Sequence, residues 1–142
     1  MILTWYPFNM KLITRNTDYA IRALAYMAGN DEKLTTAAEL VKKLKIPRQF
    51  MRSIMQKLGR KKLVKSYRGM AGGFKLNKRP SSIYIKEVVE AFQGPFILNE
   101  CFFKKNLCPN RGSCLLKRKI DRIEKHVVSE ISSISISDLL KG

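Results

Sequence analysis

An amphipathic segment in the first half of the chain restricts the possible folds more than any other feature. In residues 47–63, PRQFMRSIMQKLGRKKL, apolar residues recur as Met51, Ile54, Met55 and Leu58. Because an α-helix advances by about 100° per residue, these four side chains form one stripe that faces a core. The pattern therefore predicts a helix with one buried face and one solvent face.

The opposite face of this helix carries polar and basic side chains but no acid. Its residues are Gln49, Arg52, Ser53, Gln56 and Arg60. An ordinary solvated helix face is one interpretation. The alternative is a nucleic-acid contact, because Arg, Gln and Ser bind base edges and phosphates. The 28 Lys and Arg against 11 Asp and Glu give the chain +17, a charge that attracts nucleic acid or an anionic membrane and favours the alternative.

Two shorter helices are predicted before this segment. The first covers residues 17–29, with Thr17 or Asp18 as its N-cap. The second begins at Ala37, after Thr36, which stands three residues before Glu39 in a capping-box pattern. Pro47 separates the second helix from the amphipathic one, because the residue before a proline is pushed out of helical geometry.

A β-hairpin is predicted directly after the amphipathic helix. Val64, Tyr67, Phe74 and Leu76 lie in two short runs on either side of a turn rich in glycine. Basic side chains line the hairpin, among them Lys65, Arg68 and Lys75. Helix, turn, helix and basic hairpin in this order predict a winged helix-turn-helix. In that fold the second helix enters the major groove of DNA and the wing lies along the backbone or the minor groove.

A long amphipathic helix is predicted near the C-terminus, after a shorter helix within residues 83–93. Ser113 is its expected N-cap, and the helix runs to about Ile134. Its apolar positions are Leu116, Ile120, Ile123, Val127, Ile131 and Ile134. Such a stripe often belongs to a core. Since the domain already has core helices, we expect this one to pair with a second copy of the chain as a homodimer.

These elements divide the chain into three predicted parts within a mainly α fold. Residues 10–95 form the winged helix-turn-helix domain with its small β-hairpin wing, residues 96–113 a cysteine-rich loop, and residues 114–142 the dimerisation helix with a C-terminal turn. Met10 is a more natural beginning than Met1, so residues 1–9 are expected to be an extension.

The three cysteines of the chain are Cys101, Cys108 and Cys114, with six and five residues between them. They could be unrelated, buried, reduced thiols. However, Pro109, Gly112 and the polar character of the segment indicate an exposed loop. Zinc is a second possibility, although the closely spaced cysteine pairs of zinc knuckles are absent. The wide spacing favours an iron–sulfur cluster of the 2Fe–2S or 4Fe–4S type, for which thiolates are the usual ligands.

The hydropathy, the cysteine count and the single histidine argue against a membrane protein, a secreted protein and an enzyme. No run of about 18 apolar residues is present, so no membrane span is predicted. An odd number of cysteines without a recognisable signal peptide indicates the reducing cytoplasm. His126 is the one histidine, and no nucleophile–base pair is visible, so we expect no enzymatic activity and a solvated His126 on the long helix.

The chain resembles a family of winged-helix transcription regulators that includes the IscR cluster-homeostasis regulators and the NsrR nitric-oxide sensors. The resemblance covers residues 10 to 140. It depends on TDYAIRALAYMA in the first helix, IPRQFMRSIMQKL in the recognition helix, LVKSYRGMAGGFKL in the wing and the three cysteines before a long helix.

The resemblance implies a dimeric regulator that binds palindromic promoters with an affinity modulated by an iron–sulfur cluster. We expect this regulator to be a repressor. It implies that Gln49 and Arg52 read bases and that Arg68 enters the minor groove. It also implies cluster ligation by Cys101, Cys108 and Cys114, with Asp18 of the first helix as a ligand donated across the dimer. A helix cap is the other interpretation of Asp18. The chain differs from the IscR pattern in two ways: the first cysteine gap is longer, and Lys117 replaces a histidine. A nucleic-acid-binding protein with structural zinc remains the alternative function.

Overall fold

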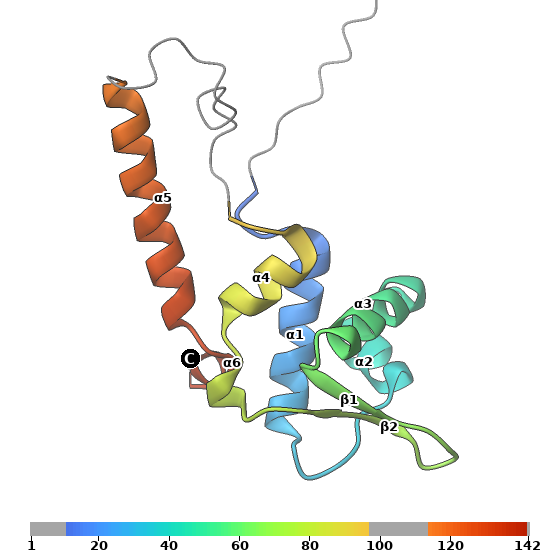
Figure 1. Cartoon of the computed structure of the whole chain (residues 1–142). Coiled ribbons are helices and arrows are strands. Elements are labelled where there is room, and N and C mark those ends of the chain that lie inside the picture. Colours follow the sequence, from blue (N-terminus) through green and yellow to red (C-terminus); the bar gives the residue numbers. More distant parts are fainter. Residues whose placement is uncertain (1–10, 97–113, 142) are drawn as a thin grey trace, which may run out of the picture.

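The computed structural model describes residues 11–96 and 114–141 (Figure 1). The elements follow in the order α1 (Arg15–Gly29), α2 (Ala37–Leu44), α3 (Arg48–Arg60), β1 (Val64–Tyr67), β2 (Gly73–Leu76), η1 (Pro80–Ser82), α4 (Ile85–Gln93), α5 (Leu115–Ser133) and α6 (Ile136–Leu139). The described strands form one antiparallel hairpin, β1–β2. The prediction of a mainly helical fold with a small β-hairpin wing is confirmed.

The core of the described fold surrounds α1, which lies between α5 on one side and α2 and α3 on the other (Figure 1). The predicted stripe of α3 faces this core, since Met51, Ile54, Met55 and Leu58 are each at most 2% exposed. Ala20, Ala23, Leu24 and Met27 of α1 are equally buried. None of the helices in the described ranges is both long enough and apolar enough to cross a membrane.

The start of α1 differs from its prediction. The helix begins at Arg15, and its N-cap is Thr14, whose hydroxyl accepts a hydrogen bond from the Thr17 backbone N–H. The buried Thr17 hydroxyl instead donates to Oε1 of Gln93 at 2.7 Å. The Asp18 carboxylate accepts a 2.8 Å hydrogen bond from Nε of Arg22. The prediction of Thr17 or Asp18 as the N-cap is therefore wrong. The hydrogen bond from Thr17 to Gln93 of α4 fixes the first turn, and Thr14 takes the cap position.

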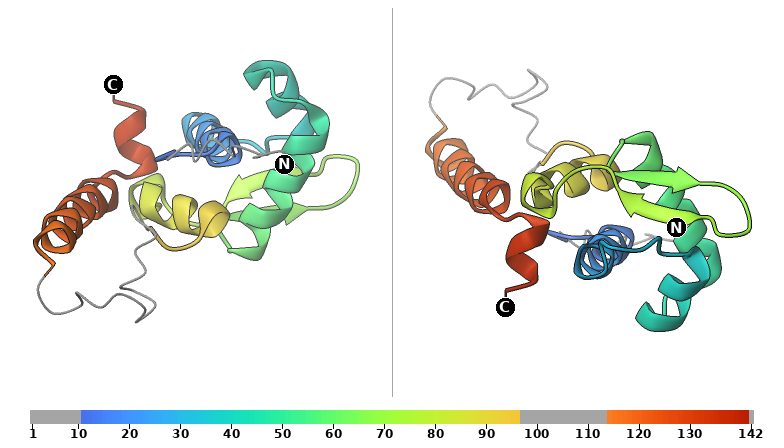
Figure 2. Two further views of the ribbon diagram at one scale, coloured as in Figure 1. Left: turned by 90° about the horizontal axis from the view of Figure 1, so that it is seen from above. Right: turned by 90° about the horizontal axis from the view of Figure 1, so that it is seen from below.

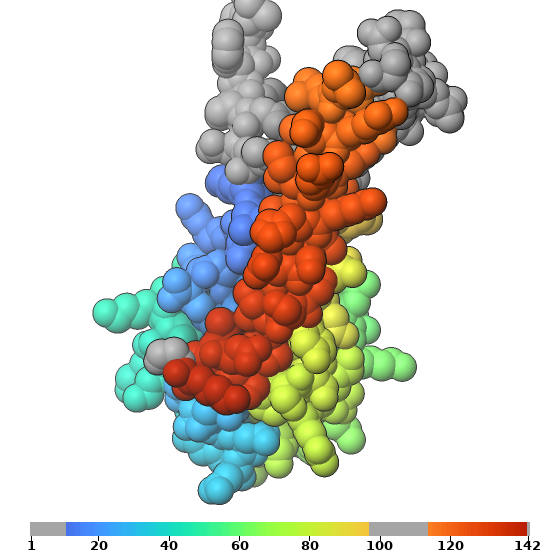
Figure 3. Space-filling model, turned by 90° about the vertical axis from the view of Figure 1, so that its left-hand side faces the viewer, coloured from blue at the N-terminus to red at the C-terminus, as the bar shows by residue number. Residues whose placement is uncertain are grey.

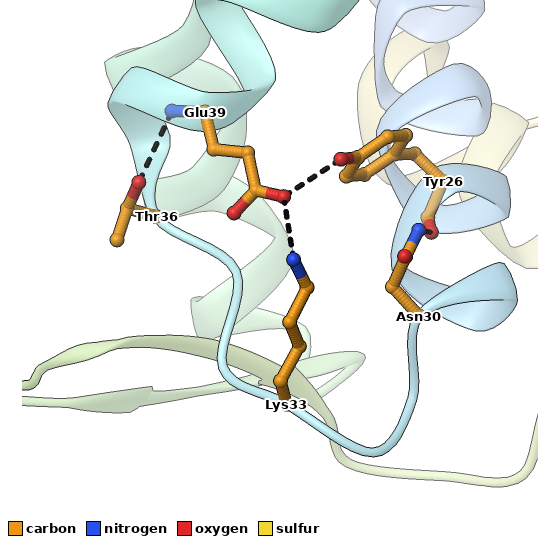
Figure 4. A network of polar contacts seen from close by, with 5 residues as sticks. All are labelled: Tyr26, Asn30, Lys33, Thr36 and Glu39. Carbon is orange, nitrogen blue, oxygen red and sulfur yellow. Dashed lines mark hydrogen bonds and ion pairs between the residues drawn. The ribbon is translucent and has the colours of Figure 1, made fainter.

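The start of α2 confirms half of the predicted capping box. Thr36 caps the helix by accepting a hydrogen bond from the Glu39 backbone N–H at 3.1 Å. The Glu39 carboxylate does not return to Thr36. It accepts hydrogen bonds from the Tyr26 hydroxyl at 2.7 Å and from Nζ of Lys33 at 3.3 Å (Figure 4). The glutamate therefore ties α2 to α1 and to the loop between them.

The predicted hairpin is confirmed, with Val64 opposite Leu76 and Lys65 opposite Lys75. An isolated bridge joins Thr35 to Phe74, so the segment before α2 lies along β2. This close approach requires glycine at position 73, where a Cβ atom would lie 2.9 Å from the Thr35 carbonyl oxygen. The wing is thereby anchored to the chain just before α2.

The long helix α5 begins one residue later than predicted. Its N-cap is Cys114, whose Sγ accepts a 3.4 Å hydrogen bond from the Lys117 backbone N–H. The prediction of Ser113 as N-cap is therefore wrong, because the thiol takes the cap position; Ser113 itself lies outside the described residues. Figure 3 shows α5 crossing one face of the molecule, with its outer side uncovered.

The segment that follows α5 folds back into the core. Ile136 of α6 is fully buried, and its backbone N–H donates to the Ile83 carbonyl at 2.8 Å. One residue earlier, Ser135 forms a bridge with Tyr84. The end of α5 thus shares a core with the winged part of the chain, and both views of Figure 2 show α6 beside α1. The division of the chain at residue 114 stays a prediction.

Candidate nucleic-acid interface

The solvent face of α3 presents the predicted contact residues together. Its five predicted side chains are all exposed: Gln49, Arg52, Ser53, Gln56 and Arg60. Their alternation with the buried stripe follows from the helical period, which places the two sets on opposite sides. Within the described ranges, none of the five forms an ion pair with an acid. The face therefore has donors ready for an anionic partner.

The hairpin adds a second basic surface beside α3. Lys65 and Lys75 are directly opposite one another in the register, on the strand face opposite that of Val64. Nζ of Lys65 lies 5.8 Å from the centre of the Tyr67 ring, within the range of a cation–π contact. Arg68 is exposed at the start of the turn, next to Gly69, whose φ of +114° favours glycine. Of the three predicted wing cations, Lys65 and Arg68 are thus exposed, whereas Lys75 is half-buried.

The region that forms α2, α3 and the hairpin is strongly basic. Residues 37–76, which cover α2, α3 and the hairpin, contain 12 Lys and Arg but one acid, Glu39. The hydrogen bond from Tyr26, followed by the contacts with Lys33 and the Thr36 cap, holds the pKa of Glu39 below its usual value. The same hydrogen bond raises the pKa of Tyr26. The single carboxylate is thus ionised and already bound, and the surface potential here is strongly positive.

A groove between α3 and the hairpin is a feature that sequence reasoning missed. The two elements lie side by side in the fold (Figures 1 and 2). The groove has a volume of about 550 Å³ and also reaches the start of α2. Its lining includes Arg52, Met55, Gln56 and Gly59 of α3, with Ser66 and Phe74 of the hairpin. The glycine inside an amphipathic helix was the one local signal that could have indicated a close approach here.

The predicted metal ligands are only partly described. Cys101 and Cys108 lie outside the described residues, so their arrangement stays a prediction. Cys114 is half-buried at the start of α5, and Asp18 is half-buried in the first turn of α1. In the part of the chain that the structure covers, no three His, Cys, Asp or Glu side chains come together as metal ligands.

Two cations beside these candidate ligands are themselves paired. Arg22 bonds the Asp18 carboxylate, and Nζ of Lys117 lies 2.6 Å from Oδ2 of Asp121. His126 is exposed on α5, as expected. The ammonium group of Lys117, the residue at which the chain differs from the resemblance, thus contacts an acid.

A recognition helix with an acid-free face, a helix packed across it and a basic hairpin together define a winged helix-turn-helix DNA-binding fold. The Rrf2 family of iron-dependent transcriptional regulators matches residues 13–142, and the chain belongs to this family. The predicted membership of the winged-helix regulators is thereby confirmed, and the chain is a transcriptional regulator.

Individual relatives agree with this assignment. The HTH-type transcriptional regulator NsrR of Oceanobacillus iheyensis is 30% identical over 132 residues, which cover 92% of this chain and 90% of that protein. The solved structure of CymR, the global cysteine regulator of B. subtilis, matches with a TM-score of 0.79 at 22% identity and covers 93% of this chain and 98% of its own. IscR of T. potens matches with a TM-score of 0.71 at 18% identity, over 91% and 85% of the two chains. The two structures show the shared fold.

Proposed function

We propose that this regulator is a homodimeric repressor that binds palindromic promoter DNA and responds to an iron–sulfur cluster. The observation that carries the DNA part is the acid-free, exposed face of α3 beside the basic hairpin. In the major groove, Gln49 and Arg52 would contact base edges, with Ser53, Gln56 and Arg60 on the same face. Arg68 would enter the minor groove, and Lys65 and Lys75 would bind phosphates.

The cluster part of the proposal assigns Cys101, Cys108 and Cys114 as ligands, with Asp18 from the partner subunit as the fourth. The two candidate ligands that the structure describes, Cys114 and Asp18, have the thiolate and carboxylate chemistry that a cluster ligand needs. The Cys114 sulfur already accepts a hydrogen bond at a helix N-terminus, where the helix dipole favours an anionic ligand. Thiolates are the usual ligands of iron–sulfur clusters, and a bound cluster would supply a site sensitive to redox state, nitric oxide or cluster supply.

The homodimer is proposed from the outer side of α5. Leu116 and Ile123 are 68% and 52% exposed, although both belong to the predicted apolar stripe. Val127 and Ile131 of the same stripe pack against the core. The stripe thus has a buried end and an uncovered end, and a second copy of α5 would cover the latter. Because the cysteine segment directly precedes α5, a cluster there would influence how the two recognition helices are spaced.

One experiment tests the cluster and the regulation together. The protein is purified without oxygen, and its visible absorption, iron, sulfide and zinc contents are measured. We expect a coloured protein that contains iron and sulfide and whose affinity for an operator selected in vitro changes when the cluster is removed. A colourless, zinc-loaded protein would support the alternative of a structural zinc site. Equal operator affinity with and without the cluster would contradict the sensing role.

A further inference from the structure

The side chain of Gln93, the last residue of α4, joins the end of that helix to the start of α1. Its Oε1 accepts a hydrogen bond from the Thr14 backbone N–H at 2.8 Å and another from the Thr17 hydroxyl at 2.7 Å. Its Nε2 donates to the Leu12 carbonyl at 3.3 Å. We propose that Gln93 is a positioning residue, which holds the turn that presents the Asp18 carboxylate to the cluster site. This inference rests on the proposed function and names a residue that acts through the proposed ligand.

The three hydrogen bonds fix the turn that carries Asp18. Thr14 is the N-cap of α1, and its carbonyl accepts a hydrogen bond from the Asp18 backbone N–H at 2.9 Å. Thr17 directly precedes Asp18 and is fully buried. Gln93 therefore holds both the cap of the helix and the neighbour of the proposed ligand. The Asp18 side chain is itself 44% exposed, so its carboxylate stays accessible to another subunit while its backbone is held.

The place of Gln93 in the fold connects this turn to the cysteine segment. The end of α4 lies beside the start of α1 (Figure 1). Gly94 ends α4 with a φ of +77°, which favours glycine, so the chain leaves the helix directly after Gln93. Cys101 stands eight positions after Gln93 in the sequence and lies outside the described residues. If Asp18 is donated across the dimer, Gln93 joins the cysteine segment of one subunit to the ligand which that subunit gives to its partner.

A metal site requires this kind of support, because its ligands must be held within about 0.5 Å of their binding positions. Removal of a group that orients a ligand typically weakens metal binding by about 10–100-fold. Without Gln93, the buried Thr17 hydroxyl would keep the Thr14 hydroxyl, 3.0 Å away, as its neighbour but would lose its shorter hydrogen bond. The first turn of α1 would then open more often, and the Asp18 carboxylate would be in position less often.

Two substitutions of Gln93 test the proposal. Gln93→Ala removes all three hydrogen bonds, whereas Gln93→Glu keeps an acceptor for Thr14 and Thr17 and loses only the donor to Leu12. In protein purified without oxygen, amide hydrogen exchange at Asp18 measures the opening of the turn. The rate at which an iron chelator removes the visible absorption measures the hold on the cluster. We expect Gln93→Ala to speed the exchange about fivefold and the loss of absorption about tenfold or more. Gln93→Glu should behave like the unmodified protein.

A milder variant and a control accompany these two. Thr17→Val removes a single hydrogen bond at nearly constant volume, so it should raise both rates by a smaller factor than Gln93→Ala does. Tyr26→Phe removes a hydrogen bond from the other end of α1 and leaves the first turn untouched. It should lower the stability of the fold without changing either rate.

The outcomes separate the proposal from the function on which it rests. Faster exchange in Gln93→Ala with an unchanged loss of absorption would make Gln93 a structural contact only and overturn the proposal, although the cluster would stand. Unchanged exchange, or a Gln93→Glu protein that behaves like Gln93→Ala, would show that Oε1 does not hold the turn. A protein that is colourless before any substitution would instead refute the proposed cluster, and the positioning role with it.

Discussion

The hydroxyl of Tyr26 on α1 donates a 2.7 Å hydrogen bond to Oε1 of Glu39 on α2 (Figure 4). The same carboxylate oxygen lies 3.3 Å from Nζ of Lys33 in the intervening loop. Glu39 is thus held by two segments outside its own helix. Because α2 packs against α3, this contact also helps to set the angle at which the recognition helix is presented.

Tyr26→Phe should lower the free energy of unfolding, and the loss should depend on pH. The hydrogen bond keeps the pKa of Glu39 below its ordinary value of 4.5. A lowered carboxyl pKa stabilises the fold above the unfolded-state pKa, and this stabilisation is lost as the pH falls through the folded-state pKa. The difference between the two proteins in urea unfolding should therefore be largest at neutral pH and shrink below pH 4.5. Tyr67→Phe, on the exposed wing, is the control. A difference that does not change with pH would contradict this account.

Lys62→Gly should stabilise the protein. Lys62 has a φ of +59°, in the left-handed region that glycine adopts without strain. Relief of this strain should raise the free energy of unfolding by about 1 kcal/mol. Lys61→Gly removes the same charge one residue earlier, where φ is −84°, and should destabilise by about 0.5–1 kcal/mol. Chemical denaturation of both variants measures the contrast, and equal changes would show that the charge, and not the backbone, is responsible.

Arg52→Ala should reduce the affinity for a selected operator by about 1–3 kcal/mol and relax the sequence preference. Lys65→Ala should weaken operator and random DNA alike and reduce the salt dependence, because a phosphate contact carries no sequence information. Fluorescence anisotropy with both duplexes at several salt concentrations measures the difference. Equal losses on the two duplexes for Arg52→Ala would argue against base reading by this residue.

Asp18→Ala should alter or labilise the proposed cluster while the fold stays intact. Thr14 caps α1, and the Asp18–Arg22 ion pair is largely exposed, so the stability should fall by less than about 1 kcal/mol. Arg22→Ala removes the same ion pair without removing the carboxylate and serves as the control. Visible absorption of protein purified without oxygen measures the effect, and Asp18→Cys should restore a cluster. An unchanged spectrum in Asp18→Ala would exclude Asp18 as a ligand.

Ile123→Glu should convert the proposed dimer into monomers. Ile123 lies on the uncovered end of the α5 stripe and is 52% exposed, so a charge there would be buried only in a dimer. Ser129→Glu introduces the same charge on another side of α5, where Ser129 is exposed, and should leave the dimer intact. Sedimentation analysis gives the mass of each. A dimeric Ile123→Glu protein would place the interface elsewhere.

The helices, the hairpin and the two faces of α3 followed from the sequence alone, because they depend on local properties. Helical periodicity separated Met51 and Leu58 from Gln49 and Arg52, and a glycine-rich turn between two short apolar runs defined the wing. The cap at Thr36 was equally local, since its hydroxyl bonds a backbone N–H only three residues away.

The tertiary structure decided what depends on residues far apart in the chain. The first turn of α1 is fixed by Gln93, which is 76 positions from Thr17, and Glu39 bonds Tyr26 in place of its own cap. Two residues of the same apolar stripe on α5 differ in burial: Ile131 is buried in the core, whereas Ile123 is exposed. The reason is that the rest of the fold covers only one end of the helix. The groove beside Gly59 exists only where α3 and the hairpin meet, so no local pattern could determine it.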